Sequence, residues 1–224
     1  MTEDRRDWQA HPSYTHNREV GAVEEVLDNP GRVLFVGDYA TILATFMAED
    51  YPTAHLITKQ DATTPAGIDQ HYTVSSYDSL PDLNPYDAVV VPCLDWPRRP
   101  DGLVRGLVDV VRSDGSIIIE LSDETGEYVS ILRTLHPNIA GDLFSERLRL
   151  LESFTTAGTV RRYQIRTAYH FQTIDDLILY FNQRSNKEQG RKLRQEEKEE
   201  LRKRGRQIGF ENVEEKRVLL HVTL

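Results

Sequence analysis

The chain has 224 residues and a formal net charge of −9, with 36 acidic against 27 basic side chains. This length suffices for one sizeable α/β domain, and the negative charge argues against broad binding to a phosphate backbone. No apolar run approaches the ~18 residues of a membrane span, and the N-terminus lacks the pattern of a secretory signal. A single cysteine, Cys93, excludes an internal disulfide and argues against a cysteine-rich zinc site. We therefore expect a cytoplasmic protein.

Short apolar runs alternate with helical patterns through the first half of the chain. Residues 1–17 form a polar arm, and a helical pattern then runs to Asp28, where Asn29-Pro30-Gly31 ends it. Further helices are predicted at 42–47 and 103–111, the second ending in a left-handed cap at Gly115. Strands are predicted at 33–36, 54–58, 72–74, 86–91 and 116–120. This alternation predicts a parallel sheet with right-handed crossovers.

The pattern changes after Leu121. Residues 125–153 are mostly helical in pattern, and 158–166 and 217–223 predict strands. Thr173 and Asp176 resemble a capping box at the start of a helix. Residues 186–207 are dominated by charges of alternating sign, which predicts a solvated helix and disfavours a nucleic-acid arm. We treat residues 18–224 as one domain that includes this charged segment.

The order of these elements resembles that of class I S-adenosylmethionine-dependent methyltransferases. Residues 33–41 read Val-Leu-Phe-Val-Gly-Asp-Tyr-Ala-Thr where that family has approximately Val-Leu-Glu-Val-Gly-Cys-Gly-Thr-Gly. Segments 57–61, 76–81, 86–91 and 110–115 are similar to the family's second strand, adenine-contacting segment, fourth strand and turn before strand five. The resemblance implies a Rossmann-like three-layer sandwich. Its sheet would be mostly parallel and seven-stranded, with an antiparallel C-terminal strand.

The resemblance also implies a binding site for S-adenosylmethionine. Gly37, Asp38 and Tyr39 would frame the methionine moiety, because a glycine turn lets backbone amides at a helix N-terminus approach a ligand. Asp61 would hold the ribose and Asp78 the adenine edge. The competing interpretation makes Gly37 and Asp38 a tight turn and a helix N-cap, and Asp61 a surface turn residue.

The nucleotide loop departs from the family pattern at three positions. Phe35 replaces the family's acid, Tyr39 the second glycine and Thr41 the third. At the point of closest cofactor approach, Tyr39 must either clash or swing out and stack elsewhere. These losses motivate an alternative function, a catalytically inactive methyltransferase-like protein kept for binding or regulation. A nicotinamide-dependent oxidoreductase ranks lower, because the loop lacks the glycine pattern that admits a pyrophosphate.

Candidates for the acceptor side lie after strand four and before the helix that begins near Thr173. Asp95 is a candidate base and Trp96 a candidate substrate platform, although an ordered loop with a packed tryptophan is the commoner arrangement. Tyr169 and His170 occupy a region that often faces the acceptor in the family. The seven histidines lack metal-ligand spacing, so no metal is predicted. The acidic chain slightly favours a small-molecule acceptor, and the acceptor and oligomeric state cannot be read from the sequence.

Overall fold

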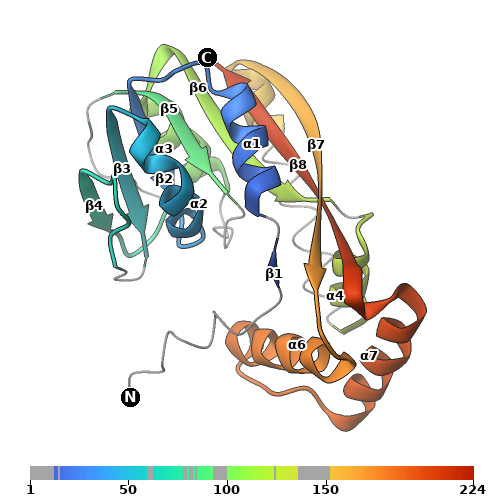
Figure 1. The fold of residues 1–224 in the computed structure, drawn as a ribbon. Coiled ribbons are helices and arrows are strands. Elements are labelled where there is room, and N and C mark those ends of the chain that lie inside the picture. Colours follow the sequence, from blue (N-terminus) through green and yellow to red (C-terminus); the bar gives the residue numbers. More distant parts are fainter. Residues whose placement is uncertain are drawn as a thin grey trace.

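A mixed sheet forms the centre of the computed structural model, which describes residues 13–14, 16–59, 63–77, 80, 83, 85–92, 100–123, 125–135 and 152–224. Within this part of the chain the sheet has eight strands in the order β1-β7-β8-β6-β5-β2-β3-β4 (Figure 1). The strands are β1 (Ser13–Tyr14), β2 (Arg32–Val36), β3 (Thr53–Thr58), β4 (Gln70–Thr73), β5 (Tyr86–Val91), β6 (Val111–Ser122), β7 (Thr159–His170) and β8 (Val213–Thr223). The helices are α1 (His16–Val26), α2 (Ala40–Met47), α3 (Pro100–Val110), α4 (Glu127–Leu135), α6 (Ile174–Gln189) and α7 (Gln195–Ile208), with short 3-10 helices η2 (Ala48–Asp50) and η3 (Phe210–Asn212).

The strand directions confirm the predicted fold class. Strands β4, β3, β2, β5 and β6 are mutually parallel, whereas β8 runs antiparallel to both β6 and β7. The seven predicted strands are thus present, and the two-residue β1 extends the sheet by pairing with Tyr169 and His170. Parallel strands present their carboxyl ends at one edge of the sheet, which is where ligands bind in open α/β folds.

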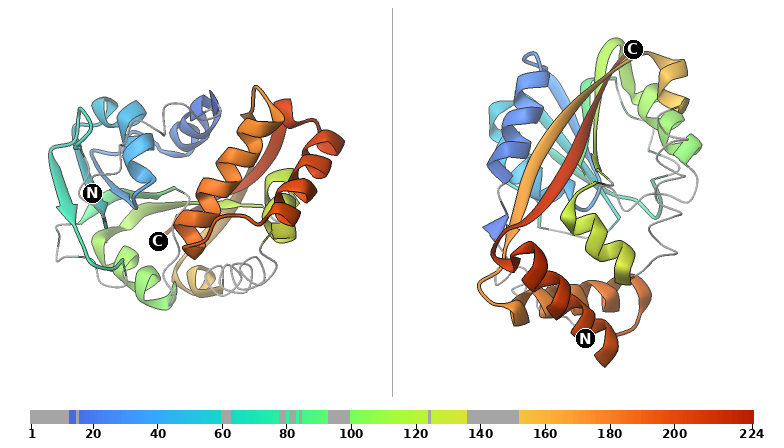
Figure 2. Two further views of the ribbon diagram at one scale, coloured as in Figure 1. Left: turned by 90° about the horizontal axis from the view of Figure 1, so that it is seen from below. Right: turned by 90° about the vertical axis from the view of Figure 1, so that its right-hand side faces the viewer.

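Apolar side chains on the two faces of the sheet form two cores. On one face Val33, Phe35 and Ile118 pack against α1 and α2 through residues such as Val23 and Leu43. On the other face Leu34, Val36 and Ile119 pack against α3. Helices therefore cover both faces of the sheet (Figure 2), as the continuous apolar runs of the buried strands require. No helix within the described residues combines the length and apolar character needed to cross a bilayer.

Strands β7 and β8 carry a second body of structure, which we call the helical lobe: α4, α6, α7 and η3. These helices lie beyond the carboxyl edge of the sheet (Figures 1 and 2). Their core is aromatic and aliphatic, and includes Tyr128, Tyr169, Phe181 and Leu201. The predicted capping box is confirmed, because the Thr173 hydroxyl accepts from the Asp176 backbone N–H and the Asp176 carboxylate accepts from the Thr173 backbone N–H.

The predicted left-handed cap at Gly115 is wrong. Helix α3 ends at Val110, and Gly115 lies inside β6 without a positive φ. A Cβ atom at this position would lie 2.8 Å from the backbone oxygen of Asp87 on β5. The glycine is needed because two strands approach closely at an irregularity in their pairing, which shifts register between Tyr86 and Ala88.

Candidate functional site

The turn after β2 is built on Gly37. Its φ of 119° lies in a region that side-chain-bearing residues rarely adopt. The Gly37 backbone N–H donates to the Ile57 carbonyl oxygen of β3 (2.8 Å), and the Gly37 carbonyl accepts from the Ala40 N–H (3.0 Å) where α2 begins. The predicted tight turn at Gly37 is therefore present, and it fixes the path of the chain from strand to helix.

Asp38 joins this turn to the loops that follow β3 and β4. Its Oδ1 accepts from the backbone N–H of Lys59 (2.8 Å) and from the hydroxyl of Tyr77 (3.0 Å). The Lys59 ammonium in turn lies 4.6 Å from the centre of the buried Tyr77 ring. Asp38 is not the N-cap, because the N-cap of α2 is Tyr39, which makes no side-chain capping bond. The Asp38 carboxylate thus holds three loops together at the carboxyl edge.

Tyr39 stands where the family pattern has its second glycine, and its side chain swings aside. The ring lies against the guanidinium of Arg217 on β8, with 5.5 Å between the Arg217 Cζ atom and the ring centre. The order β8-β6-β5-β2 separates the two backbones by three strand spacings, roughly 14 Å at the usual ~4.8 Å per strand. The two side chains therefore reach toward each other across the ends of β5 and β6.

Arg217 belongs to a buried charged group, the Arg217 cluster: Arg217, Glu19 of α1, Glu120 of β6 and Glu215 of β8. None of the four residues is more than 2% exposed. Arg217 Nη1 donates to Glu19 and to Glu120 Oε1 (2.9 Å), and Nη2 donates to Glu215 Oε2 (3.0 Å). Burial, with a further contribution from Glu19, raises the pKa of Glu120 to about 8, so this carboxyl holds a proton at neutral pH.

The cluster lies at the same edge of the sheet as Gly37. Phe35 pairs with Val90, and Val90 pairs with Ile118, so Gly37 and Glu120 stand level two residues further along their strands. The sequence interpretation missed this cluster. A signal was present: Glu215 and Arg217 continue the two-residue spacing of the apolar Val213 and Leu219 along β8, and Glu19 precedes Val23 by one helical turn.

The two described residues predicted on the acceptor side lie in different surroundings. Tyr169 is 9% exposed and stacks on Tyr128, with ring centres 4.8 Å apart, inside the aromatic core of the helical lobe. His170 is exposed, and its Nδ1 lies 3.1 Å from the Glu211 carbonyl oxygen. It lines a shallow cavity of about 250 Å³ together with Arg18, Arg166, Thr167, Ala168, Asn212 and Glu214. Their roles in acceptor binding stay predictions.

Four predicted site residues, Asp61, Asp78, Asp95 and Trp96, lie outside the described residues, as does Cys93. Their assignments therefore stay predictions as well. Where the structure describes side chains, it brings together no group of three His, Cys, Asp or Glu residues suited to a metal ion. The described part of the site consists of the Gly37 turn, the Asp38 contacts and the Tyr39–Arg217 pair.

Comparison with known proteins places this geometry in a known fold. No family model and no curated protein sequence matches the chain. A protein from Anabaena variabilis, described as a methyltransferase of an antibiotic biosynthesis pathway, is similar in structure with a TM-score of 0.61 and 14% identity, over 93% of this chain and 97% of that one. A protein from Bacillus halodurans described as a methyltransferase gives 0.56 and 10%, over 92% and 98%. The methyltransferase domain of a bacterial Hen1 protein gives 0.55 and 12%, over 93% and 99%. The chain thus has the Rossmann-like fold of class I S-adenosylmethionine-dependent methyltransferases.

Proposed function

We propose that the chain is an S-adenosylmethionine-dependent methyltransferase that acts on a small-molecule acceptor. The observation that carries the proposal is the Gly37 turn, held at the carboxyl edge of a sheet with the methyltransferase strand order and tied by Asp38 to the two neighbouring loops. A turn fixed in this way presents a preformed surface, so little ordering is needed when a ligand binds.

The charges at this edge fit a cationic ligand. S-adenosylmethionine carries a positive sulfonium, and the Arg217 cluster contains three carboxyl groups for one guanidinium. The cluster therefore holds more acidic than basic groups in a region shielded from water. Such a field favours a nearby positive charge more strongly than it would in bulk solvent.

When bound, S-adenosylmethionine supplies an electrophilic methyl group. In the proposal the backbone of residues 37–39 orients the methionine end, while Asp61 and Asp78 hold the ribose and adenine. Asp95 or His170 removes a proton from the acceptor, and Trp96 and Tyr169 line the acceptor side. Proximity and alignment supply most of the rate enhancement in such a displacement, and a positioned base adds a smaller factor.

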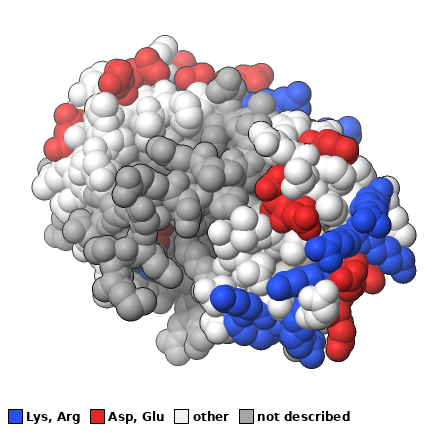
Figure 3. Space-filling view, turned by 60° about the horizontal axis from the view of Figure 1, so that its bottom comes forward, with Lys and Arg blue, Asp and Glu red and all other residues white. Residues whose placement is uncertain are grey.

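Ion pairs in the charged segment reduce the positive charge available to a nucleic acid, which is consistent with a small-molecule acceptor. Residues 184–206 contain ten Lys and Arg against five Glu, and Figure 3 shows basic side chains gathered at the α6–α7 end of the molecule. Three of these arginines are engaged with carboxylates: Arg191 and Arg194 with Glu197, and Arg202 with Asp175 and Glu199. Neutralised in this way, they contribute less to binding a phosphate backbone.

Calorimetric titration of the full chain with S-adenosylmethionine and S-adenosylhomocysteine tests the proposal. Micromolar binding of both is expected, and Asp61→Ala should weaken it by at least about tenfold through loss of the ribose contact. Asp114→Ala is the matched control, because Asp114 is exposed near the amino end of β6, away from the carboxyl edge. A folded protein that binds neither compound contradicts the proposal and supports the binding or regulatory alternative. Binding of NADH alone would instead favour an oxidoreductase.

A further inference from the structure

The Tyr39–Arg217 contact joins the nucleotide loop to the buried cluster. A tyrosine in place of a glycine adds a large ring at the point where a ligand comes closest to the backbone. The ring lies instead over Arg217, toward β8 and away from the loops after β3 and β4, where Asp38 meets Lys59 and Tyr77. The position of the Tyr39 ring thus decides whether the face of the loop is open.

Arg217 is held in place from three elements. Its Nη1 is bound by Glu19 of α1 and Glu120 of β6, and its Nη2 by Glu215 of β8. Because the carboxyl groups engage these nitrogens in the plane of the guanidinium, the flat face of that group remains for an aromatic ring. The cluster therefore presents a fixed cationic face at the end of β8, toward which Tyr39 turns.

A buried ion cluster of this kind is a costly way to hold helices on a sheet. Taking charges out of water costs several kcal/mol per ion, and apolar residues of similar volume often give equal or greater stability. Anchoring α1 to β6 and β8 does not require charge, since Val23 and Leu27 of the same helix already pack against the sheet. A guanidinium face is, in contrast, something that apolar residues cannot supply.

We propose that Arg217 is a positioning residue, which holds the Tyr39 ring aside and so keeps the loop of residues 37–39 open to an adenosyl ligand. The proposal rests on the proposed function for the identity of the ligand. Glu19, Glu120 and Glu215 act through Arg217 by fixing its orientation. If the cluster served only to anchor α1, the effect of an Arg217 substitution on ligand affinity would not depend on whether Tyr39 is present.

The test is a double-mutant cycle read by calorimetric binding of S-adenosylhomocysteine at pH 7. Arg217→Lys keeps a buried cation but removes the planar guanidinium on which the ring stacks, so the ring is no longer held in place and affinity should fall about tenfold. Tyr39→Gly removes the ring and should leave the affinity within about threefold of the wild type. The double variant should recover the affinity of Tyr39→Gly, because no ring is left to obstruct the loop. Arg217→Met, if it folds, should behave as Arg217→Lys does.

Nitration of Tyr39 by tetranitromethane, measured by peptide mass, provides a readout that needs no ligand. Arg217→Lys should raise the rate of Tyr39 nitration severalfold, while Glu197→Gln, in the helical lobe, should leave it unchanged. Unchanged nitration, or a double variant as weak as Arg217→Lys, overturns the positioning role. Binding by Tyr39→Gly but not by the wild type shows that Tyr39 obstructs the loop, and also overturns it. Raised nitration in a protein that never binds the ligand rejects the proposed function and the ligand, and leaves the control of Tyr39 by Arg217 standing.

Discussion

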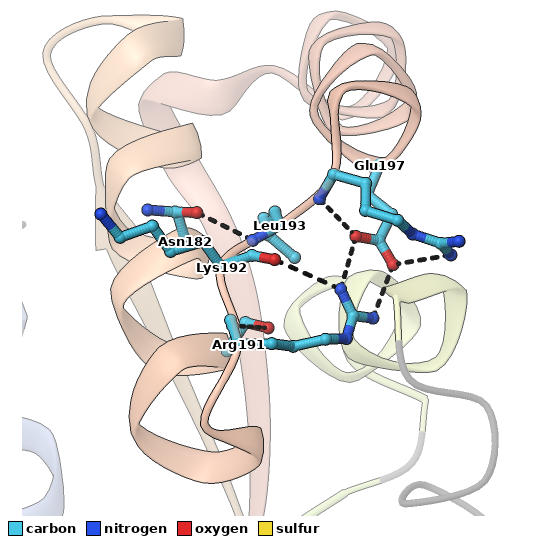
Figure 4. A network of polar contacts seen from close by, with 7 residues as sticks. Asn182, Arg191, Lys192, Leu193 and Glu197 are labelled. Carbon is cyan, nitrogen blue, oxygen red and sulfur yellow. Dashed lines mark hydrogen bonds and ion pairs between the residues drawn. The ribbon is translucent and has the colours of Figure 1, made fainter.

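Two regions of this molecule contain the same chemical pair, an arginine and a carboxylate, in opposite surroundings. In the Arg217 cluster every residue is at most 2% exposed. In the turn between α6 and α7, Arg191 donates to both oxygens of Glu197 at 2.8 and 2.7 Å (Figure 4). There the Arg191 side chain is 39% exposed and that of Glu197 12% exposed. The two regions differ in exposure and also in charge balance, because the Arg217 cluster has three carboxyl groups for one guanidinium, whereas Glu197 is bound by two arginines.

The two carboxyl groups respond in opposite directions. Burial raises the pKa of Glu120 to about 8, despite the neighbouring Arg217. Hydrogen bonds from Arg191, with help from the Arg194 backbone and side chain, lower the pKa of Glu197 to about 2. Pairing stabilises the charge at the surface, whereas in the interior the cost of desolvation exceeds the gain from pairing. Mutations in the two regions should therefore differ greatly in their consequences.

The largest effect is expected from removing the buried cation. Arg217→Met leaves three buried carboxyl groups without a positive partner, and should lower the free energy of unfolding by about 3–5 kcal/mol. Urea unfolding followed by circular dichroism measures this loss. Arg202→Met is the matched control, because Arg202 pairs with the exposed Asp175 and Glu199; its free energy of unfolding should stay within about 1 kcal/mol of the wild type. Equal losses in the two variants would remove the contrast between the regions.

The next effect is a pH dependence that only the buried region should show. Glu120 holds its proton in the folded state up to about pH 8, whereas the unfolded chain releases it near pH 4.3. The folded state therefore binds the extra proton between these values, and stability falls as pH rises through this window. Between pH 6 and pH 8 the loss should be about 2 kcal/mol.

Glu120→Gln isolates this contribution, because glutamine does not titrate and other groups cancel in the comparison. The wild type should lose stability relative to this variant as pH rises from 6 to 8, and the difference should level off above pH 8. Urea midpoints at several pH values supply the measurement. Parallel curves for the two proteins would mean that Glu120 is ionised in the folded state.

A smaller effect is expected at the start of the helical lobe. Thr173→Ala removes the hydroxyl that accepts from the Asp176 backbone at the first turn of α6, and should cost about 1 kcal/mol. Thr134→Ala is the control, since the Thr134 hydroxyl bonds only to the Ser130 carbonyl inside α4 and its loss should be close to neutral. Thermal unfolding compares the two, and a larger loss for Thr134→Ala would contradict the capping argument.

These contrasts also explain which features were predictable from the sequence. The strand positions and the Thr173 cap follow from apolar periodicity and local hydrogen bonding, which depend on residues close in sequence, whereas the sheet architecture was implied by the resemblance to class I methyltransferases. Gly115 was misassigned, because its reason is contact with Asp87 on a neighbouring strand. The Arg217 cluster joins residues up to 198 positions apart, from Glu19 to Arg217. Periodicity places Glu215 and Arg217 on the face of Val213 and Leu219, but it does not identify the distant residues that pair with a buried charge.

Within the site, the Gly37 turn was predictable from residues close in sequence, whereas the final position of the Tyr39 ring depends on a tertiary contact. The turn at Gly37 was predictable because a glycine between a strand and a helix is a local signal for a tight turn. For Tyr39 the sequence left two outcomes open, a clash or stacking elsewhere. The tertiary contact itself, made from β8 beyond β5 and β6, identifies Arg217 as the group on which the ring stacks.

The smallest effect is expected from the Arg191–Glu197 pair, whose arginine is partly exposed to solvent. Glu197→Gln removes the charge that Arg191 binds but keeps an oxygen for the Arg194 backbone N–H, so the start of α7 is preserved. At pH 7 the Tm should fall by no more than about 2 °C, and less at high salt, because exposed pairs are screened. Because the pKa of Glu197 is lowered to about 2, its contribution is complete above about pH 4.3 and is lost as pH falls through 2. Differential scanning calorimetry at low and high salt tests this. A loss of stability comparable to that of Arg217→Met would show that pairing geometry, and not burial, determines how much a charged pair contributes to the stability of this protein.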